Sequence, residues 1–289
     1  MHTLKLFLSL AGLIWLVSCT DDTLPPPPVE ARLTPSEILT RLQSDYELMP
    51  EEQIVMSGDS STFAQYASPT ERYAHGVFGD VIEAGQLIVA LDGVIYEEIL
   101  EETFVYEDLR PRLSDVDGDG VLEIITIRAH VDLGAALVIY KVIDGQLVEY
   151  TKVPEIGIPN RWLNPVATHD LDGDGQVEIA WIQTPHIGGI LKVARFSEGE
   201  LTVLSETSLY SNHDARDKNL CLSVLTRSGD DIITYVPSQN RDRIVGFSLI
   251  DDRLVQRDEI IMEVDFTVPL ADQYPFTQVI PDDLNCINP

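Results

Sequence analysis

Two nine-residue stretches of the chain carry acidic side chains at a spacing that could bind a metal ion. They are residues 115–123 (DVDGDGVLE) and residues 170–178 (DLDGDGQVE). In both stretches aspartates stand at positions 1, 3 and 5, glycine at position 6 and glutamate at position 9. Alternate side chains of a tight loop point to its concave side, so we expect the three aspartates of each stretch to converge on one point.

The donor atoms of these loops predict calcium. Carboxylate and carbonyl oxygens are the hard ligands that calcium prefers, whereas magnesium demands a stricter octahedral geometry and gives up its waters reluctantly. We therefore expect two Ca²⁺ sites. An ordinary Asp/Gly turn is the alternative for one such loop, and the repetition of the pattern favours the metal site. The predicted ligands are Asp115, Asp117, Asp119, Val121 (through its carbonyl) and Glu123 in the first loop, and Asp170, Asp172, Asp174, Gln176 and Glu178 in the second.

The segments that follow the loops predict strands. Apolar runs at residues 124–127 and 179–182 come directly after the two glutamates. A calcium loop of the EF-hand type is twelve residues long and leads into a helix. The two loops are therefore expected to join strand to strand.

The strands repeat along the chain. The two loops begin 55 residues apart, and each is followed by two predicted strands, a turn (Asp144-Gly145 and Glu198-Gly199) and another strand. A third copy without the metal ligands is expected around residues 228–231, and a fourth upstream, around Gly79-Asp80 and Glu83. A period near 50 residues with four strands per unit predicts an all-β fold, a β-propeller of four-stranded blades.

We expect about five blades, with four as the alternative. The fifth blade would combine residues 264–289 with some of residues 50–70, so that both chain ends share one sheet. A short helix is predicted ahead of the propeller at residues 35–49, with Ser36 as its N-cap and an apolar stripe that packs on the domain.

The acidic pattern followed by an apolar strand resembles the FG-GAP/VCBS repeat of integrin-alpha-type β-propellers. Over about residues 70–260 the chain is similar to a group of bacterial VCBS-repeat lipoproteins of unassigned function. This resemblance implies the propeller fold and calcium binding, but no activity, because one fold hosts many functions. The chain departs from the repeat at residues 228–230, which cannot form a metal site. The matching stretches are residues 72–80, 111–115, 161–165, 184–186 and 211–213.

The first nineteen residues predict a targeting segment. Lys5 precedes an apolar stretch too short to span a membrane comfortably, and the segment ends Leu16-Val17-Ser18-Cys19. This ending resembles a bacterial lipobox, in which Cys19 becomes the lipidated first residue; a plain secretory signal is the alternative. Residues 20–34, with four consecutive prolines, are predicted to be a tether, and residues 35–289 the propeller domain. We therefore expect a protein of the bacterial cell envelope, anchored by lipid, at the outer membrane, and facing the periplasm or the cell surface.

The net charge excludes two classes of partner, and the cysteines predict a disulfide. The net charge of −29 argues against nucleic acid and against flat docking on an anionic bilayer. In an exported protein disulfides persist, so Cys221 and Cys286 are expected to pair.

Successive strands of a blade run in opposite directions, so the loops that join them emerge alternately at its two ends. The loops at the end opposite the acidic loops are a second candidate site. Its candidate ligand-binding residues are His75, Arg161, Trp162, His186 and His213. These cationic and aromatic groups suit an anionic or sugar-like ligand, carried by a protein or glycan of the envelope. The alternative is structural: the tryptophan fills the space between blades and the histidines cap loops. We predict a binding module rather than an enzyme, because no nucleophile-and-base motif is present; an enzyme that uses this histidine face is the runner-up.

Overall fold

The computed structural model of the chain describes residues 32–50 and 53–281. These residues belong to one compact unit that begins at Arg32. Cys19, the four prolines of the predicted tether and Cys286 lie outside the described residues, so the lipid anchor, the tether and the Cys221–Cys286 pairing stay predictions. Over the described ranges, no helix is both long and apolar enough to cross a membrane.

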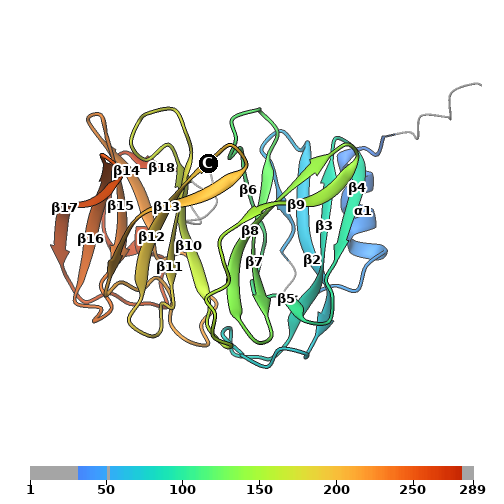
Figure 1. The fold of residues 1–289 in the computed structure, drawn as a ribbon, viewed down its shortest axis with the longest axis horizontal. Helices are drawn as coiled ribbons and strands as arrows, with labels where there is room; N and C mark the ends of the chain where they lie inside the picture. Colours follow the sequence, from blue (N-terminus) through green and yellow to red (C-terminus); the bar gives the residue numbers. More distant parts are fainter. Residues whose placement is uncertain (1–31, 51–52, 282–289) are drawn as a thin grey trace, which may run out of the picture. The chain divides into compact units, whose positions relative to one another are not determined.

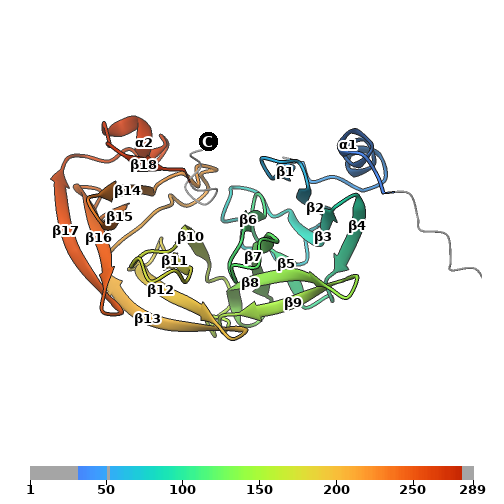
Figure 2. The ribbon, with the colours of Figure 1, turned by 90° about the horizontal axis from the view of Figure 1, so that it is seen from above.

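The fold is all-β, a propeller built from units of four antiparallel strands (Figures 1 and 2). The first unit holds β1 (Val55–Met56), β2 (Thr62–Thr70), β3 (Glu83–Leu91) and β4 (Val94–Ile99). The second holds β6 (Arg112–Ser114), β7 (Glu123–His130), β8 (Gly134–Ile143) and β9 (Gln146–Lys152). The third holds β10 (Leu163–His169), β11 (Glu178–Gln183), β12 (Ile190–Ser197) and β13 (Glu200–Ser208). The fourth holds β14 (Val224–Ser228), β15 (Asp231–Pro237), β16 (Arg243–Ile250) and β17 (Arg253–Ile261).

Each unit carries the same two-residue turn between its third and fourth strands. The turns are residues 92–93, 144–145, 198–199 and 251–252. Both residues of every turn have positive φ, as in Asp144 (52°) and Gly145 (76°). That geometry matches the right-handed twist of the flanking strands and explains the aspartate and glycine at these positions.

The strand pairing corrects the predicted fourth copy of the repeat. The segment with Gly79, Asp80 and Glu83 follows β2, a nine-residue strand that the sequence analysis did not predict. Gly79 and Asp80 therefore lie in the connection between the second and third strands of the first unit, and Glu83 begins the third strand, so the segment does not correspond to an acidic loop. The equivalent of the metal loop is the short turn between β1 and β2, where Asp59 accepts hydrogen bonds from Ser57 and Ser61.

The described residues form four units, so the expected fifth blade is not found among them. Residues 55–70 belong to the first unit. The C-terminal segment makes helix α2 (Leu270–Gln273) and β18 (Val279–Ile280), which pairs with β14 as a fifth strand of the last sheet. Strand β5 (Phe104–Tyr106) bridges β3 and β7 and joins the first two units into one nine-stranded sheet.

Helix α1 spans Pro35–Ser44 and is shorter than predicted. Its N-cap is Thr34 and not Ser36: the Thr34 hydroxyl accepts a bond from the Glu37 amide while the Glu37 carboxylate accepts one from the Thr34 amide. This reciprocal capping box satisfies two free donors at the helix start. Ile38 and Leu42 are buried against the first unit, as the apolar stripe indicates.

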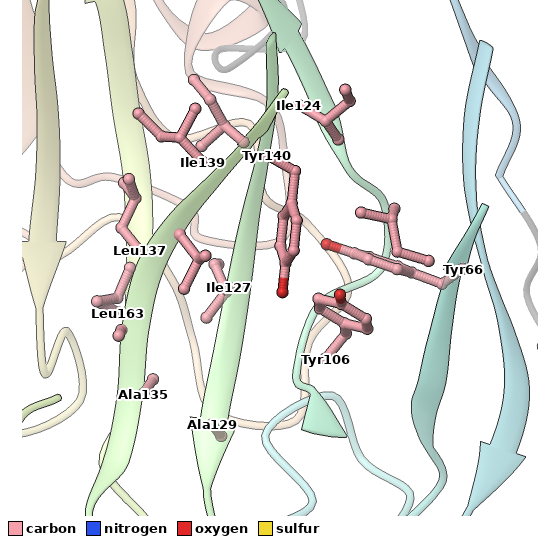
Figure 3. Packing of buried hydrophobic residues seen from close by; sticks show 14 of the residues in the cluster. Tyr66, Tyr106, Ile124, Ile127, Ala129, Ala135, Leu137, Ile139, Tyr140 and Leu163 are labelled. Atoms are coloured by element: carbon pink, nitrogen blue, oxygen red, sulfur yellow. The ribbon is translucent and has the colours of Figure 1, made fainter. Parts of the chain in front are cut away.

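The core between the first two units contains stacked tyrosines. The rings of Tyr66 and Tyr106 stack with centroids 5.0 Å apart, and Tyr140 meets Tyr106 edge-on at 6.1 Å. Figure 3 shows the three rings between strands of the two units, beside Ile124 and Ile127. All five side chains are buried, so this cluster belongs to the core that joins the first two units.

Candidate metal loops and histidine pocket

In the first loop three carboxylates converge. Ligand oxygens of Asp115, Asp117 and Glu123 lie within 4.8 Å of one another. Backbone amides hold the loop in shape: Gly120 donates to Asp115 (3.1 Å) and Val116 donates to Glu123 (2.7 Å). Positions 1, 3 and 9 of the pattern are thus brought together as the spacing predicts.

The second loop repeats this geometry. Ligand oxygens of Asp170, Asp172 and Glu178 lie within the same 4.8 Å. Gly175 donates to Asp170 (3.0 Å) and Leu171 donates to Glu178 (2.9 Å), at the positions equivalent to those in the first loop.

The aspartates at position 5 are used differently from the prediction. Asp119 accepts from the amide of Val121 (2.9 Å) and Asp174 from the amide of Gln176 (2.8 Å). Neither belongs to the converging triad of its loop. The Gln176 side chain donates to Asp174 (3.0 Å). Position 5 therefore shapes the turn in this structure.

In the second and the third unit, a basic side chain from the third strand pairs with the acidic loop of that unit. Lys141 in β8 pairs with Asp117 (2.5 Å), Asp119 (2.8 Å) and Glu123 (2.7 Å). Arg195 in β12 pairs with Asp172 (2.5 Å) and Glu178 (2.7 Å).

The sequence analysis missed both bases. The signal available to it was a basic residue near the end of a largely apolar segment in each of the two repeats. The strand register explains why a basic residue stands at this position, because Arg195 lies directly opposite Glu178 in the ladder of β11 and β12.

These contacts shift the titration of the loops. Burial raises the pKa of Glu123 and of Glu178 above the usual range, against the effect of their hydrogen bonds to base and backbone. Burial alone would lower the pKa of Lys141, but its three carboxylate partners raise it. Lys141 therefore stays charged, and each loop keeps one fixed positive charge among four carboxylates.

The loops fit a hard divalent cation. Their donors are all oxygens, and four carboxylates against one base leave a net negative charge. The Oδ1 atom of Asp115 is buried and has no hydrogen-bond partner among the described residues. A buried carboxylate oxygen without a partner is costly, and a bound cation would satisfy it.

A cleft of about 640 Å³ lies between the two loops. Its walls include Asp117 and Asp119 of the first loop and Gln176 of the second, and Tyr150 and Phe196 contribute aromatic surface. The Tyr150 hydroxyl donates to Asp117 (3.0 Å), which ties this wall to the first loop.

Four of the five predicted ligand-binding residues lie together at the other end of the blades. One small hollow of about 30 Å³ is lined by His75 from the β2–β3 connection, Arg161 and Trp162 before β10, and His186 after β11. Strand β11 runs from Glu178 of the second metal loop to Gln183. At the ordinary rise of a strand this separates hollow and metal loop by roughly 17–20 Å.

Two of the five predicted residues are almost fully buried. Trp162 and His213 are 2% and 1% exposed; Trp162 lines the hollow, whereas His213 does not. The Trp162 indole donates to the carbonyl of Glu107 (2.8 Å) and its ring stacks on His186. These contacts fit the structural alternative for Trp162, and its place in the wall of the hollow fits the ligand-binding prediction.

His213 forms a hydrogen bond with His186 on the buried side of that ring. Nε2 of His186 lies 2.8 Å from Nδ1 of His213, and Nε2 of His213 lies 2.9 Å from the carbonyl oxygen of Asp217. Burial, with His75 adding to it, lowers the pKa of His186 to about 4. Burial and the neighbouring His186 lower the pKa of His213 to about 3.

His75 is backed by a buried carboxyl group. Its Nδ1 makes a short contact with Oε1 of Glu107, which is fully buried. Burial raises the pKa of Glu107 well above its usual range, and nearby Asp108 adds to this. Burial and neighbouring acids also raise the pKa of Glu83 to about 10. Sequence reasoning did not single out Glu107, because its partners His75 and Trp162 come from two other connections.

Comparisons with known proteins bear on the repeat. Residues 115–181 match the FG-GAP-like repeat family, a stretch that contains both acidic loops. No curated protein matches the chain.

Among solved structures, the chain is similar to two rhamnogalacturonan lyases, the exotype enzyme YesX and the enzyme YesW. Each is 14% identical with a TM-score of 0.37; 74% and 75% of this chain align with 50% and 53% of theirs. A protein from Lactobacillus plantarum is 13% identical with a TM-score of 0.37, and 72% of this chain aligns with 56% of it. The chain thus spans about half the length of these solved structures.

Proposed function

We propose that the chain is a calcium-binding β-propeller module of the bacterial cell envelope that binds a ligand. The observation that carries the metal part is the convergence of three carboxylates in each of two equivalent loops. The FG-GAP-like repeat matched over residues 115–181 supports the same reading. Asp115, Asp117 and Glu123 would hold one ion, and Asp170, Asp172 and Glu178 the other.

The role of calcium is architectural. Four carboxylates gathered in one short loop repel one another, and Lys141 or Arg195 offsets only one of the four charges. Calcium modules that work outside the cell bind in the range of ~0.1–1 mM. At tenfold saturation each ion would stabilise the folded chain by about 1.4 kcal/mol.

The ligand site is the hollow formed by His75, Arg161 and His186. These side chains come from three separate connections and meet at one place. The partner is a protein or glycan of the envelope, and the module reaches it from a lipid anchor at Cys19.

An acid–base enzyme is the second candidate. The observation in its favour is the hydrogen bond between His186 and His213, because a base held by a second group is the usual arrangement in acid–base catalysis. Turnover that disappears in His186→Ala, or zinc in the purified protein, would favour the enzyme.

A thermal melt of the purified protein in calcium, in magnesium and in chelator tests the metal part. We expect an upward shift in calcium that magnesium does not reproduce. Identical melting temperatures in all three media would contradict the proposal.

A further inference from the structure

The tautomers of the two buried imidazoles follow from their partners. The carbonyl of Asp217 can only accept, so Nε2 of His213 carries the proton and its Nδ1 is an acceptor. Nε2 of His186 must then donate to that Nδ1. Because burial keeps both rings neutral, Nδ1 of His186 is left as a bare acceptor. No described residue hydrogen-bonds to it, and His186 lines the hollow.

His75 is the second imidazole at the hollow, and it has a free donor where His186 has a free acceptor. His75 and Glu107 share one proton between Nδ1 and Oε1, because a net charge on so buried a pair is costly. The second proton of the His75 ring then stays on Nε2, which makes this atom a donor. Within the described part of the chain Nε2 has no hydrogen-bond partner. The hollow is therefore lined by one imidazole that can donate and one that can accept.

A group that both donates and accepts complements the two rings. A hydroxyl group does so, and a hollow of about 30 Å³ admits about one such group. Arg161 also lines the hollow. Its guanidinium donates to the carbonyl of Asn160 (2.8 Å) and has further planar donors that suit a carboxylate.

We propose that the hollow binds a hydroxyl group of an acidic sugar, with His75 donating to it, His186 accepting from it, and Arg161 pairing with the sugar carboxylate. The rest of the ligand lies over the rim. His213 and Glu107 are positioning residues, since they act through the two imidazoles. This inference rests on the proposed binding role of this face and names the class of its ligand.

The first test reads the tautomers directly, without a ligand. Long-range ¹⁵N–¹H correlation spectra of the purified protein at pH 7 separate protonated from bare ring nitrogens. We expect His186 to be protonated at Nε2 only and His75 at Nε2. A His186 ring protonated at Nδ1 would overturn the proposal.

The second test measures binding of D-glucuronate by calorimetry, with D-glucose and acetate as probes that lack the carboxylate or the hydroxyls. We expect glucuronate to bind more tightly than either. His186→Ala should weaken it about tenfold, and Arg161→Ala by about ten- to a hundredfold, because the second loss includes a charge-assisted bond. His186→Asn, which keeps an acceptor near the place of Nδ1, should retain part of the affinity.

Two substitutions outside the hollow are the matched controls. His130→Gln removes an imidazole at the end of β7, and Arg253→Ala removes an exposed arginine in β17. Both should bind glucuronate as the parent protein does. Absence of glucuronate binding, or glucose binding of equal strength, would overturn the assignment of an acidic sugar. A calcium-dependent melt that persists in that case would leave the metal module standing, so the two failures are distinguishable.

Discussion

Lys141 in β8 and Arg195 in β12 occupy the same place in successive repeats, each bridging the position-3 aspartate and the position-9 glutamate of its own acidic loop. The contacts are 2.5 Å to Asp117 and 2.7 Å to Glu123 for the lysine, and 2.5 Å to Asp172 and 2.7 Å to Glu178 for the arginine. A fixed cation thus holds part of each loop together before any metal is bound. It also lowers the net charge that attracts the metal.

Lys141→Met should therefore act in opposite directions on the two states. Without metal, the first loop loses its counter-charge, and we expect a lower melting temperature in chelator by about 3–8 °C, as for a charge pair worth a few kcal/mol. With calcium, the more negative loop attracts the ion more strongly, so the calcium-induced shift should be larger than in the parent protein. Differential scanning calorimetry in both media measures this.

Lys192→Met is the matched control for that experiment. Lys192 lies in β12 and pairs across the strand with Glu206 at 3.3 Å, away from both acidic loops. Its replacement should change the melting temperature equally in calcium and in chelator. A calcium shift in Lys141→Met no larger than in the parent protein would contradict the role given to the lysine.

Asp170→Asn separates metal binding from the ion pair. Asp170 accepts from the amides of Gly173 and Gly175, bonds that an asparagine oxygen can partly keep. We expect the variant to lose about 1.4 kcal/mol in saturating calcium, or about 3–6 °C, and to change little in chelator. Asp144→Asn, in the two-residue turn after β8, should behave as the parent protein in both media. Equal losses in both media would argue for a purely structural aspartate.

The sequence predicted those parts of the fold and site that depend on local spacing. The acidic loops and the glycine-containing turns recur at a fixed period, and the apolar runs after each loop became β7 and β11. Strand β2 was not predicted, because Gln65, Ser68 and Pro69 interrupt its apolar pattern and proline is unusual inside a strand. Its position was needed to assign the first unit correctly.

The chemical detail of the two sites depends on pairing across strands and connections. Arg195 faces Glu178 only because β11 and β12 align in that register. The alternation of strand directions predicted that His186 and Arg161 would lie at one end of the blades, and His75 was added to that group as a candidate. The buried Glu107 and the hydrogen bond from Trp162 depend on packing between the first three units. One-dimensional spacing contains no information on that packing.

Glu83 makes the stability of the fold depend on pH. It is 3% exposed, and burial with nearby acids raises its pKa to about 10. The folded chain then holds this proton more tightly than the unfolded chain, so stability falls as pH rises from about 4.5 toward 10. Glu83→Gln removes this dependence and should stabilise the protein at pH 8.5 by about 1–3 kcal/mol, with little effect near pH 4.5.

Urea unfolding of the parent protein and Glu83→Gln at several pH values between 4.5 and 8.5 measures the difference. The two free energies of unfolding should diverge steadily with rising pH. Parallel curves would show that Glu83 is ionised in the folded chain at neutral pH.

A comparison of Trp162 with Trp181 measures the contribution of one buried hydrogen bond, from the Trp162 indole to the Glu107 carbonyl, to stability. Trp162 and Trp181 are 2% and 1% exposed, and both belong to the same core. The Trp162 indole donates to the carbonyl of Glu107, whereas the Trp181 indole nitrogen has no partner among the described residues. Replacing either by phenylalanine removes similar ring volume, but only Trp162→Phe leaves a buried carbonyl without its donor. We expect it to cost about 1–3 kcal/mol more than Trp181→Phe in chemical denaturation. Equal costs would mean that the bond to Glu107 contributes nothing to stability, and that the position of Glu107 behind His75 is fixed by packing alone.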